Sequence, residues 1–127
     1  MKKLLLVFIA LSFVVVSAVA QSLPYSVLRA TQEGDAVGLA ESFNSNIELI
    51  LPSKSGVFSK SQAEYVMADF FKQYPSASFN VIHQGQRESA SFTIGKYSSA
   101  NGTFRFTFLS KNSGGTTLIH QLRIEKE

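Results

Sequence analysis

The best-patterned stretch of the chain is residues 59–74, SKSQAEYVMADFFKQY, and it predicts an amphipathic helix. Ser59 and Gln62 have the spacing of a capping box at a helix N-terminus. Apolar residues then recur at offsets of three and four, so that they share one face: Ala63, Val66, Met67, Phe70, Phe71 and Tyr74. We expect Pro75 to end the helix. Such a helix needs a matching apolar surface against which it can bury this face.

The segments after the helix alternate between apolar and polar residues, as half-buried strands do. Four such segments are separated by turn-forming residues, among them Asn101-Gly102 and Gly114-Gly115. Strict alternation predicts the following inward positions: Phe79, Val81, His83, Phe92, Ile94, Phe104, Phe106, Phe108, Leu118, His120, Leu122 and Ile124. The strands therefore supply the apolar face that the helix needs.

The part of the chain before the long helix predicts two short helices and two strands. The helices are expected over residues 23–33 and 36–43, and the strands over residues 46–51 and 55–58. The complete element order predicts an α+β fold. In this fold the N-terminal helices and the long helix pack in the concave face of a curved antiparallel sheet.

The chain begins with the layout of a secretory signal peptide. Two lysines precede a mainly apolar run over residues 4–16, and Ala18-Val19-Ala20 resembles a cleavage site. This run is shorter than the roughly 20 residues that a membrane-spanning helix takes, although a retained signal anchor is the alternative. We expect residues 1–20 to be removed and residues 21–127 to form one domain. That domain is expected in the periplasm or outside the cell, with no membrane association after cleavage.

Composition argues against several functional classes. The chain has no cysteine, which removes disulfides, thiol catalysis and cysteine-ligated zinc. Without the two lysines of the signal peptide, ten basic residues stand against nine acidic ones, unlike the basic surface of a nucleic-acid binder. Two histidines without further ligands fall short of a zinc site. No phosphate loop, nucleophile elbow or dinucleotide fingerprint is present. We therefore expect no cofactor, no metal and no nucleic-acid partner.

Several residue runs carry a family resemblance. They are Gly34-Asp35, Phe58-Ser59-Lys60-Ser61-Gln62-Ala63-Glu64, Asp69-Phe70-Phe71, His83-Gln84-Gly85, Ile94-Gly95-Lys96-Tyr97, Gly102-Thr103-Phe104-Arg105 and Gln121-Leu122-Arg123-Ile124. With these runs and this element order, the chain resembles an uncharacterised family of small exported bacterial proteins, a domain of unknown function. Its members carry the cone of nuclear transport factor 2 and ketosteroid isomerase, in the SnoaL-like and cystatin-like superfamily. The resemblance implies a fold and a compartment but no active site.

The predicted alternation places both histidines on the concave side of the sheet. There, His83 or His120 could act as a general base. We expect these two, with Tyr97 and Phe106, to line a pocket for a small apolar ligand. The alternative is that each histidine is a hydrogen-bonded core residue and that phenylalanines fill the pocket. No carboxylate is in phase with this pocket, so the acid and base pair of an isomerase is not evident.

The convex sheet face is the second candidate site. It mixes arginine with aliphatic residues, and relatives with the cone fold often dimerise through this face. The expected interface residues are Arg105, Leu109, Ile119 and Arg123. The alternative is that the arginines pair with Glu88 or Glu125 in solvent.

These observations favour a non-catalytic exported domain over an enzyme. It would bind a small apolar ligand or a protein partner, through the cone pocket or the convex face, and would form a homodimer if the convex face pairs with itself. The alternative is an isomerase, dehydratase or hydrolase with His83 or His120 as its general base. A purely structural interaction protein is the third hypothesis.

Overall fold

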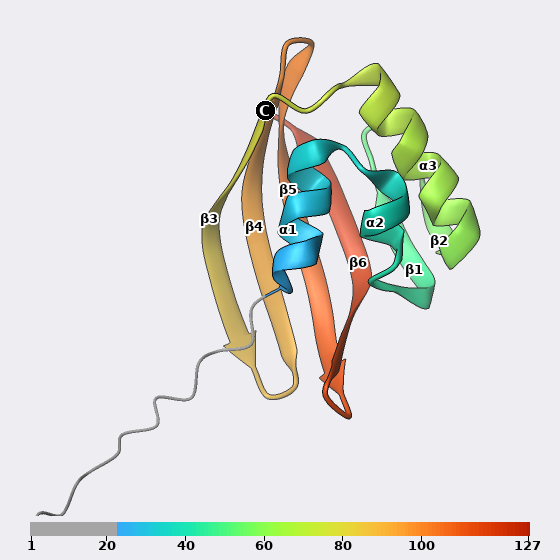
Figure 1. Cartoon of the computed structure of the whole chain (residues 1–127), viewed down its shortest axis with the longest axis vertical. Coiled ribbons are helices and arrows are strands. Elements are labelled where there is room, and N and C mark those ends of the chain that lie inside the picture. The colour runs from blue at the N-terminus through green and yellow to red at the C-terminus, as the bar shows by residue number, and fades with distance from the viewer. Residues whose placement is uncertain (1–22) are drawn as a thin grey trace, which may run out of the picture.

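The computed structural model describes residues 23–127, in which three helices pack against one six-stranded sheet (Figure 1). The helices are α1 (Tyr25–Glu33), α2 (Ala36–Ala40) and α3 (Lys60–Gln73). The strands are β1 (Phe43–Ile50), β2 (Ser55–Ser59), β3 (Ser78–Arg87), β4 (Ala90–Ser99), β5 (Gly102–Ser113) and β6 (Thr116–Lys126). The predicted element order and the α+β fold are confirmed. The predicted signal peptide, residues 1–20, lies outside the described residues.

Local signals in the sequence set the helix ends. At the start of α3, the Ser59 hydroxyl accepts from the Gln62 N–H at 3.2 Å, and the Gln62 side chain accepts from the Ser59 N–H at 3.1 Å. This is the predicted capping box. Asp35 caps α2 by accepting from the Gly38 N–H at 3.0 Å. Gly34 ends α1 in the left-handed conformation, with φ of 67°, which costs glycine little.

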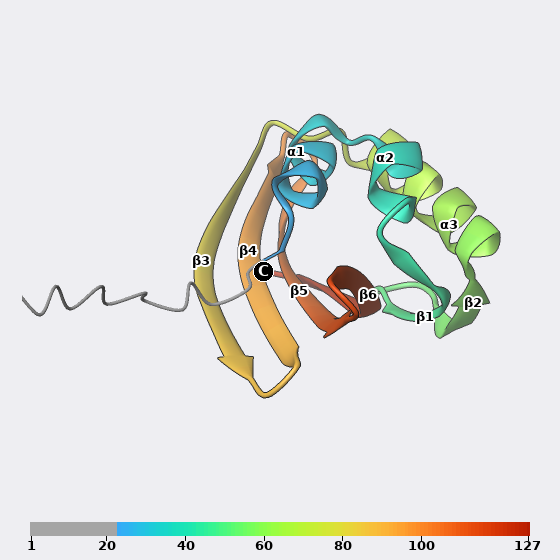
Figure 2. The same cartoon turned by 60° about the horizontal axis from the view of Figure 1, so that its bottom comes forward.

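The sheet has the strand order β2-β1-β6-β5-β4-β3. The last four strands form the predicted antiparallel meander, and β1 and β2 form an antiparallel hairpin. The sheet is antiparallel as expected except at one pair, because β1 and β6 run parallel. The reason is that α3 connects the two edge strands, β2 and β3. The meander then runs back across the sheet from β3, so that its last strand, β6, lies beside β1. The sheet curves around the helices, with α1 inside the curve (Figure 2).

Aromatic rings fill the space between α3 and the concave face. The ring of Phe70 lies at the centre, 5.1 Å from the Phe104 ring and 5.7 Å from the Phe106 ring, measured between centroids. The buried Tyr97 ring stacks on Phe106 at 4.8 Å, and its hydroxyl donates to the Tyr74 carbonyl at 2.5 Å. We call this group the aromatic cluster: Phe70, Phe71, Tyr74, Phe79, Tyr97, Phe104, Phe106 and Phe108. Its many ring contacts make it the main packing element of the core.

Candidate functional site

His83 lies on the convex face of the sheet, so its predicted place inside the cone is wrong. Val81 pairs with Gly95, whereas His83 pairs with Ile94, which makes Ile82 the extra residue of a β-bulge. An extra residue shifts the two-residue alternation of a strand by one position. His83 therefore faces away from the helices and is exposed to solvent.

His120 is displaced in the same way. Its two neighbours pair with adjacent residues of β5, Leu109 and Ser110, so His120 is the extra residue of a second bulge. Ile119 takes the inward position and is fully buried, which makes its predicted interface role wrong. His120 is half-buried. Burial lowers the pKa of its imidazole, and the neighbouring cation of Lys111 lowers this pKa further.

The four residues of the predicted cone pocket do not come together. Tyr97 and Phe106 face the cone and are both fully buried within the aromatic cluster. His83 and His120 lie on the other side of the sheet. Aromatic side chains of the protein itself therefore occupy the place where the sequence predicted an apolar ligand.

An apolar patch occupies the convex face instead. Phe92, predicted in the core, lies there opposite Leu109 and is 41% exposed. Its ring rests against Gly85 of β3, where a Cβ atom would lie 2.5 Å from the Phe92 Cε1. Ile94 is half-buried on the same face, and the bulge residue Ile82 is 57% exposed. We call Phe92, Leu109, Ile94 and Ile82 the outer patch.

Basic side chains adjoin the outer patch. Lys96 of β4 lies directly opposite Arg105 of β5, which places two cations side by side. Arg105 forms an ion pair with Glu127, with 3.3 Å between Nε and Oε2. Glu125, one of the two glutamates expected as its partner, lies directly opposite Arg105 across the strands. Arg123, also predicted at the interface, is exposed and pairs with Thr107 of β5 across the strands. This face combines apolar and cationic groups, as protein interfaces often do.

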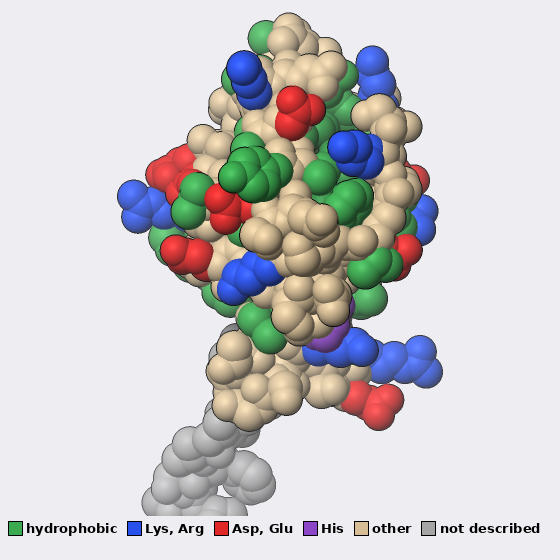
Figure 3. Space-filling model, turned by 90° about the vertical axis from the view of Figure 1, so that its right-hand side faces the viewer, with side chains coloured by type: hydrophobic (Ala, Val, Ile, Leu, Met, Phe, Trp, Pro, Cys, Tyr) green, Lys and Arg blue, Asp and Glu red, His purple; other side chains and the backbone are tan. Residues whose placement is uncertain are grey.

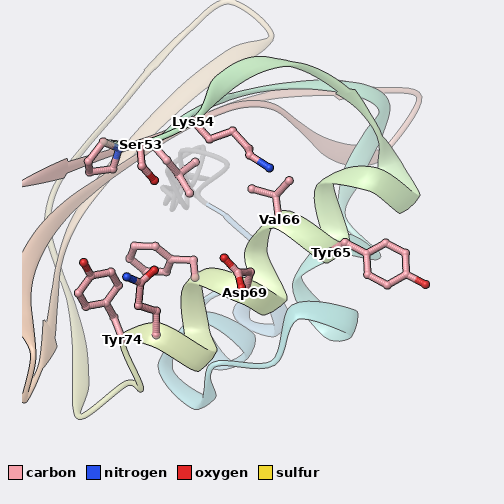
Figure 4. A pocket seen from close by; sticks show the side chains of 10 residues that line it. Ser53, Lys54, Tyr65, Val66, Asp69 and Tyr74 are labelled. Carbon is pink, nitrogen blue, oxygen red and sulfur yellow. The ribbon is translucent and has the colours of Figure 1, made fainter.

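A pocket of about 280 Å³ lies between the β1–β2 turn and α3 (Figure 4). Its lining includes three apolar residues and three polar ones: Leu51, Phe70 and Tyr74, with Lys54, Asp69 and Gln73. On the side of the molecule that carries α3 and β2, basic, acidic and apolar side chains are interspersed (Figure 3). The sequence did not predict this pocket, because its walls come from two segments that are separate in the chain. A turn that brings distant residues opposite a helix leaves no periodic signal in the sequence.

Metal-binding groups, membrane-spanning helices and histidine ion pairs were each sought among the described residues. Residues 23–127 contain no group of three or more His, Asp or Glu side chains that could hold a metal ion. Within the same residues, no helix is long and apolar enough to span a bilayer. Neither histidine forms an ion pair with a described carboxylate.

The curved sheet around a long helix defines the class of protein, a nuclear transport factor 2-like cone. An NTF2-like protein of unknown function from Cytophaga hutchinsonii is similar to this chain at 12% identity, with a TM-score of 0.58 over 81% of this chain and 85% of that one. At this identity the likeness shows the fold alone.

The family is shown by closer matches. The model of DUF4783, a domain of unknown function, matches residues 25–125, and the chain belongs to this family. Crystal structures of DUF4783 proteins from Bacteroides ovatus and Bacteroides uniformis are 33% and 37% identical to it, with TM-scores of 0.80 and 0.78. The two matches cover 85% and 84% of this chain, respectively, and each covers 98% of the Bacteroides chain. No curated protein matches the chain.

Proposed function

We propose that this protein is a non-catalytic, exported binding domain that binds another protein chain through the outer patch and the adjoining cations. The proposal rests on the exposure of large apolar side chains on the convex face, 41% for Phe92 and 57% for Ile82. Clustered apolar groups left in water commonly mark a binding surface. The signal-peptide pattern of residues 1–20 supports an exported location, in the periplasm or outside the cell.

A second copy of the chain is the first partner to test. A two-fold axis through the convex face would place the outer patches of two copies against each other. Phe92→Glu puts a carboxylate at the centre of the patch. Val37→Glu is the matched control, because Val37 lies on α2 and is also strongly exposed, at 58%. Sedimentation velocity at tens of micromolar should give a dimer for the wild type and for Val37→Glu, and a monomer for Phe92→Glu.

A dimer that survives Phe92→Glu would argue against this interface. A monomeric wild type would exclude the second copy and leave a different protein as the partner. A photo-crosslinking amino acid at position 92, with position 37 as the control, then tests that partner in the cell that exports the protein. Cross-links from position 92 alone would support the proposal, and their absence from both positions would refute it.

Catalysis has less support than binding. A general base needs a substrate pocket within hydrogen-bond reach. His83 and His120 instead lie on the convex face, and the cone interior beside Tyr97 and Phe106 is filled. A small apolar ligand inside that part of the cone lacks support for the same reason.

A further inference from the structure

The pocket between the β1–β2 turn and α3 has walls that the fold holds in place. Within the turn, the Leu51 N–H donates to the Lys54 carbonyl at 2.9 Å. At the end of α3, the Tyr97 hydroxyl holds the carbonyl of Tyr74, and the Tyr74 N–H donates to the Phe70 carbonyl at 2.8 Å. A preformed site avoids much of the ordering cost that binding otherwise carries.

The lining of this pocket is partly apolar, and opposite charges lie on its two walls. Leu51, Phe70 and Tyr74 supply the apolar part. Lys54 extends from the turn towards α3, and Asp69 points from α3 into the same space, whereas Tyr65 points away (Figure 4). Within residues 23–127, neither Lys54 nor Asp69 has an ion-pair or hydrogen-bond partner for its side chain. Both charged groups are thus free to pair with a ligand.

We propose that this pocket binds a small zwitterion with an apolar side chain, namely an apolar α-amino acid such as phenylalanine or leucine. The ligand carboxylate would pair with the Lys54 ammonium, and the ligand ammonium with the Asp69 carboxylate. The apolar side chain would lie against Phe70 and Tyr74. Because Lys54 and Asp69 are exposed, neither pays a large desolvation cost before the ligand arrives.

The size of the pocket agrees with this class of ligand. Small-molecule sites usually measure roughly 300–1,000 Å³, and the volume here, about 280 Å³, lies just below that range, as suits a ligand of few atoms. A ligand with only one charge would leave either the ammonium or the carboxylate of the pocket without a partner. A zwitterion satisfies both, so charge complementarity selects it over a simple fatty acid or amine.

The test is an NMR titration of the ¹⁵N-labelled protein with L-phenylalanine. Chemical-shift changes should appear at residues 51–54 and along α3 below about 10 mM ligand, which corresponds to weak binding of a small molecule. Lys54→Met and Asp69→Asn should each weaken the affinity roughly tenfold, since each removes a charged hydrogen bond. Lys72→Met is the matched control on α3, because Lys72 does not line the pocket, and it should leave the affinity unchanged.

Two analogues assign the charges. N-acetyl-L-phenylalanine lacks the ammonium group, so its weaker binding should be insensitive to Asp69→Asn. L-phenylalaninamide lacks the carboxylate, so its weaker binding should be insensitive to Lys54→Met. The proposal is overturned if L-phenylalanine causes no shift changes at these residues up to about 10 mM. It is also overturned if both pocket variants retain the wild-type affinity.

Discussion

Replacing Gly95 by alanine should destabilise the protein by roughly 2–3 kcal/mol, because the added methyl group has no free space. A Cβ atom on Gly95 would lie 2.5 Å from the Cε1 atom of Phe79, nearer still to its Cζ atom, and 3.2 Å from the Asn80 carbonyl oxygen. Two other rings restrict the movement of the Phe79 ring on the core side, since its centroid lies 5.8 Å from that of Phe106 and 6.2 Å from that of Phe108. The clash must therefore be relieved by moving packed rings or the backbone.

Gly85→Ala is a matched control for this prediction. A Cβ atom there would also lie 2.5 Å from a Cε1 atom, that of Phe92. The Phe92 ring is on the convex face and can turn into solvent. A glycine-to-alanine change also gains roughly 0.4–1 kcal/mol by restricting the unfolded chain. Gly85→Ala should therefore change the unfolding free energy by less than about 1 kcal/mol in either direction.

Urea unfolding followed by circular dichroism measures the change in unfolding free energy for Gly95→Ala and for Gly85→Ala, and thermal unfolding gives the change in Tm. At roughly 4–8 °C per kcal/mol for a domain of this size, Gly95→Ala should lower Tm by roughly 10–20 °C. Phe79→Leu should partly relieve the clash, so the double variant should lose less stability than the two single losses added together. Equal losses for Gly95→Ala and Gly85→Ala, or strict additivity with Phe79→Leu, would refute the packing argument.

Three further predictions concern single side chains. Ser59→Ala removes the cap of α3 and should cost roughly 1 kcal/mol in urea unfolding; an unchanged midpoint would contradict the capping role. Burial raises the pKa of Tyr97 to about 12, above its ordinary value, so its stabilisation is complete below about pH 10 and is lost as pH rises towards 12. Wild type should lose more stability than Tyr97→Phe over that interval, and parallel losses would contradict this. Arg105→Glu removes an exposed ion pair with Glu127 and should cost less than about 1 kcal/mol in the monomer. It should nevertheless shift sedimentation towards the monomer, and an unaltered dimer would speak against the convex interface.

The sequence predicts the elements of this fold well because their signals are local. The face of α3 follows from the spacing of its apolar residues, and its start follows from the capping box of Ser59 and Gln62. The meander follows from alternation and from turn-forming glycines. These features depend on neighbours within a few positions, and the sequence contains those neighbours directly.

The candidate site was harder to predict because it depends on register between strands. The bulges at Ile82 and His120 each move a histidine to the convex face, and alternation within one strand carries no sign of a bulge. The error at Phe92 did have a signal in the sequence. Phe92 and Tyr97 are separated by an odd number of positions, so one unbroken strand cannot direct both inward. Gly95 lies on the same inward face of β4 as Tyr97. Because Gly95 has no side chain, the Phe79 ring can occupy the space beside it.

The position of β6 has a consequence for how this chain reaches its native state. The strand β6 lies in the interior of the sheet, between β5 and β1, and the Gln121 side chain of β6 donates to the Glu48 carboxylate of β1 at 2.8 Å. A chain delivered from its N-terminus, by a ribosome or through a membrane pore, cannot pair β1 with β6 until the last eleven-residue strand has emerged. Such non-local pairing makes folding slow. Until β6 is available, the edge of β1 that pairs with β6 stays unpaired. This favours delivery of the whole chain before the sheet forms.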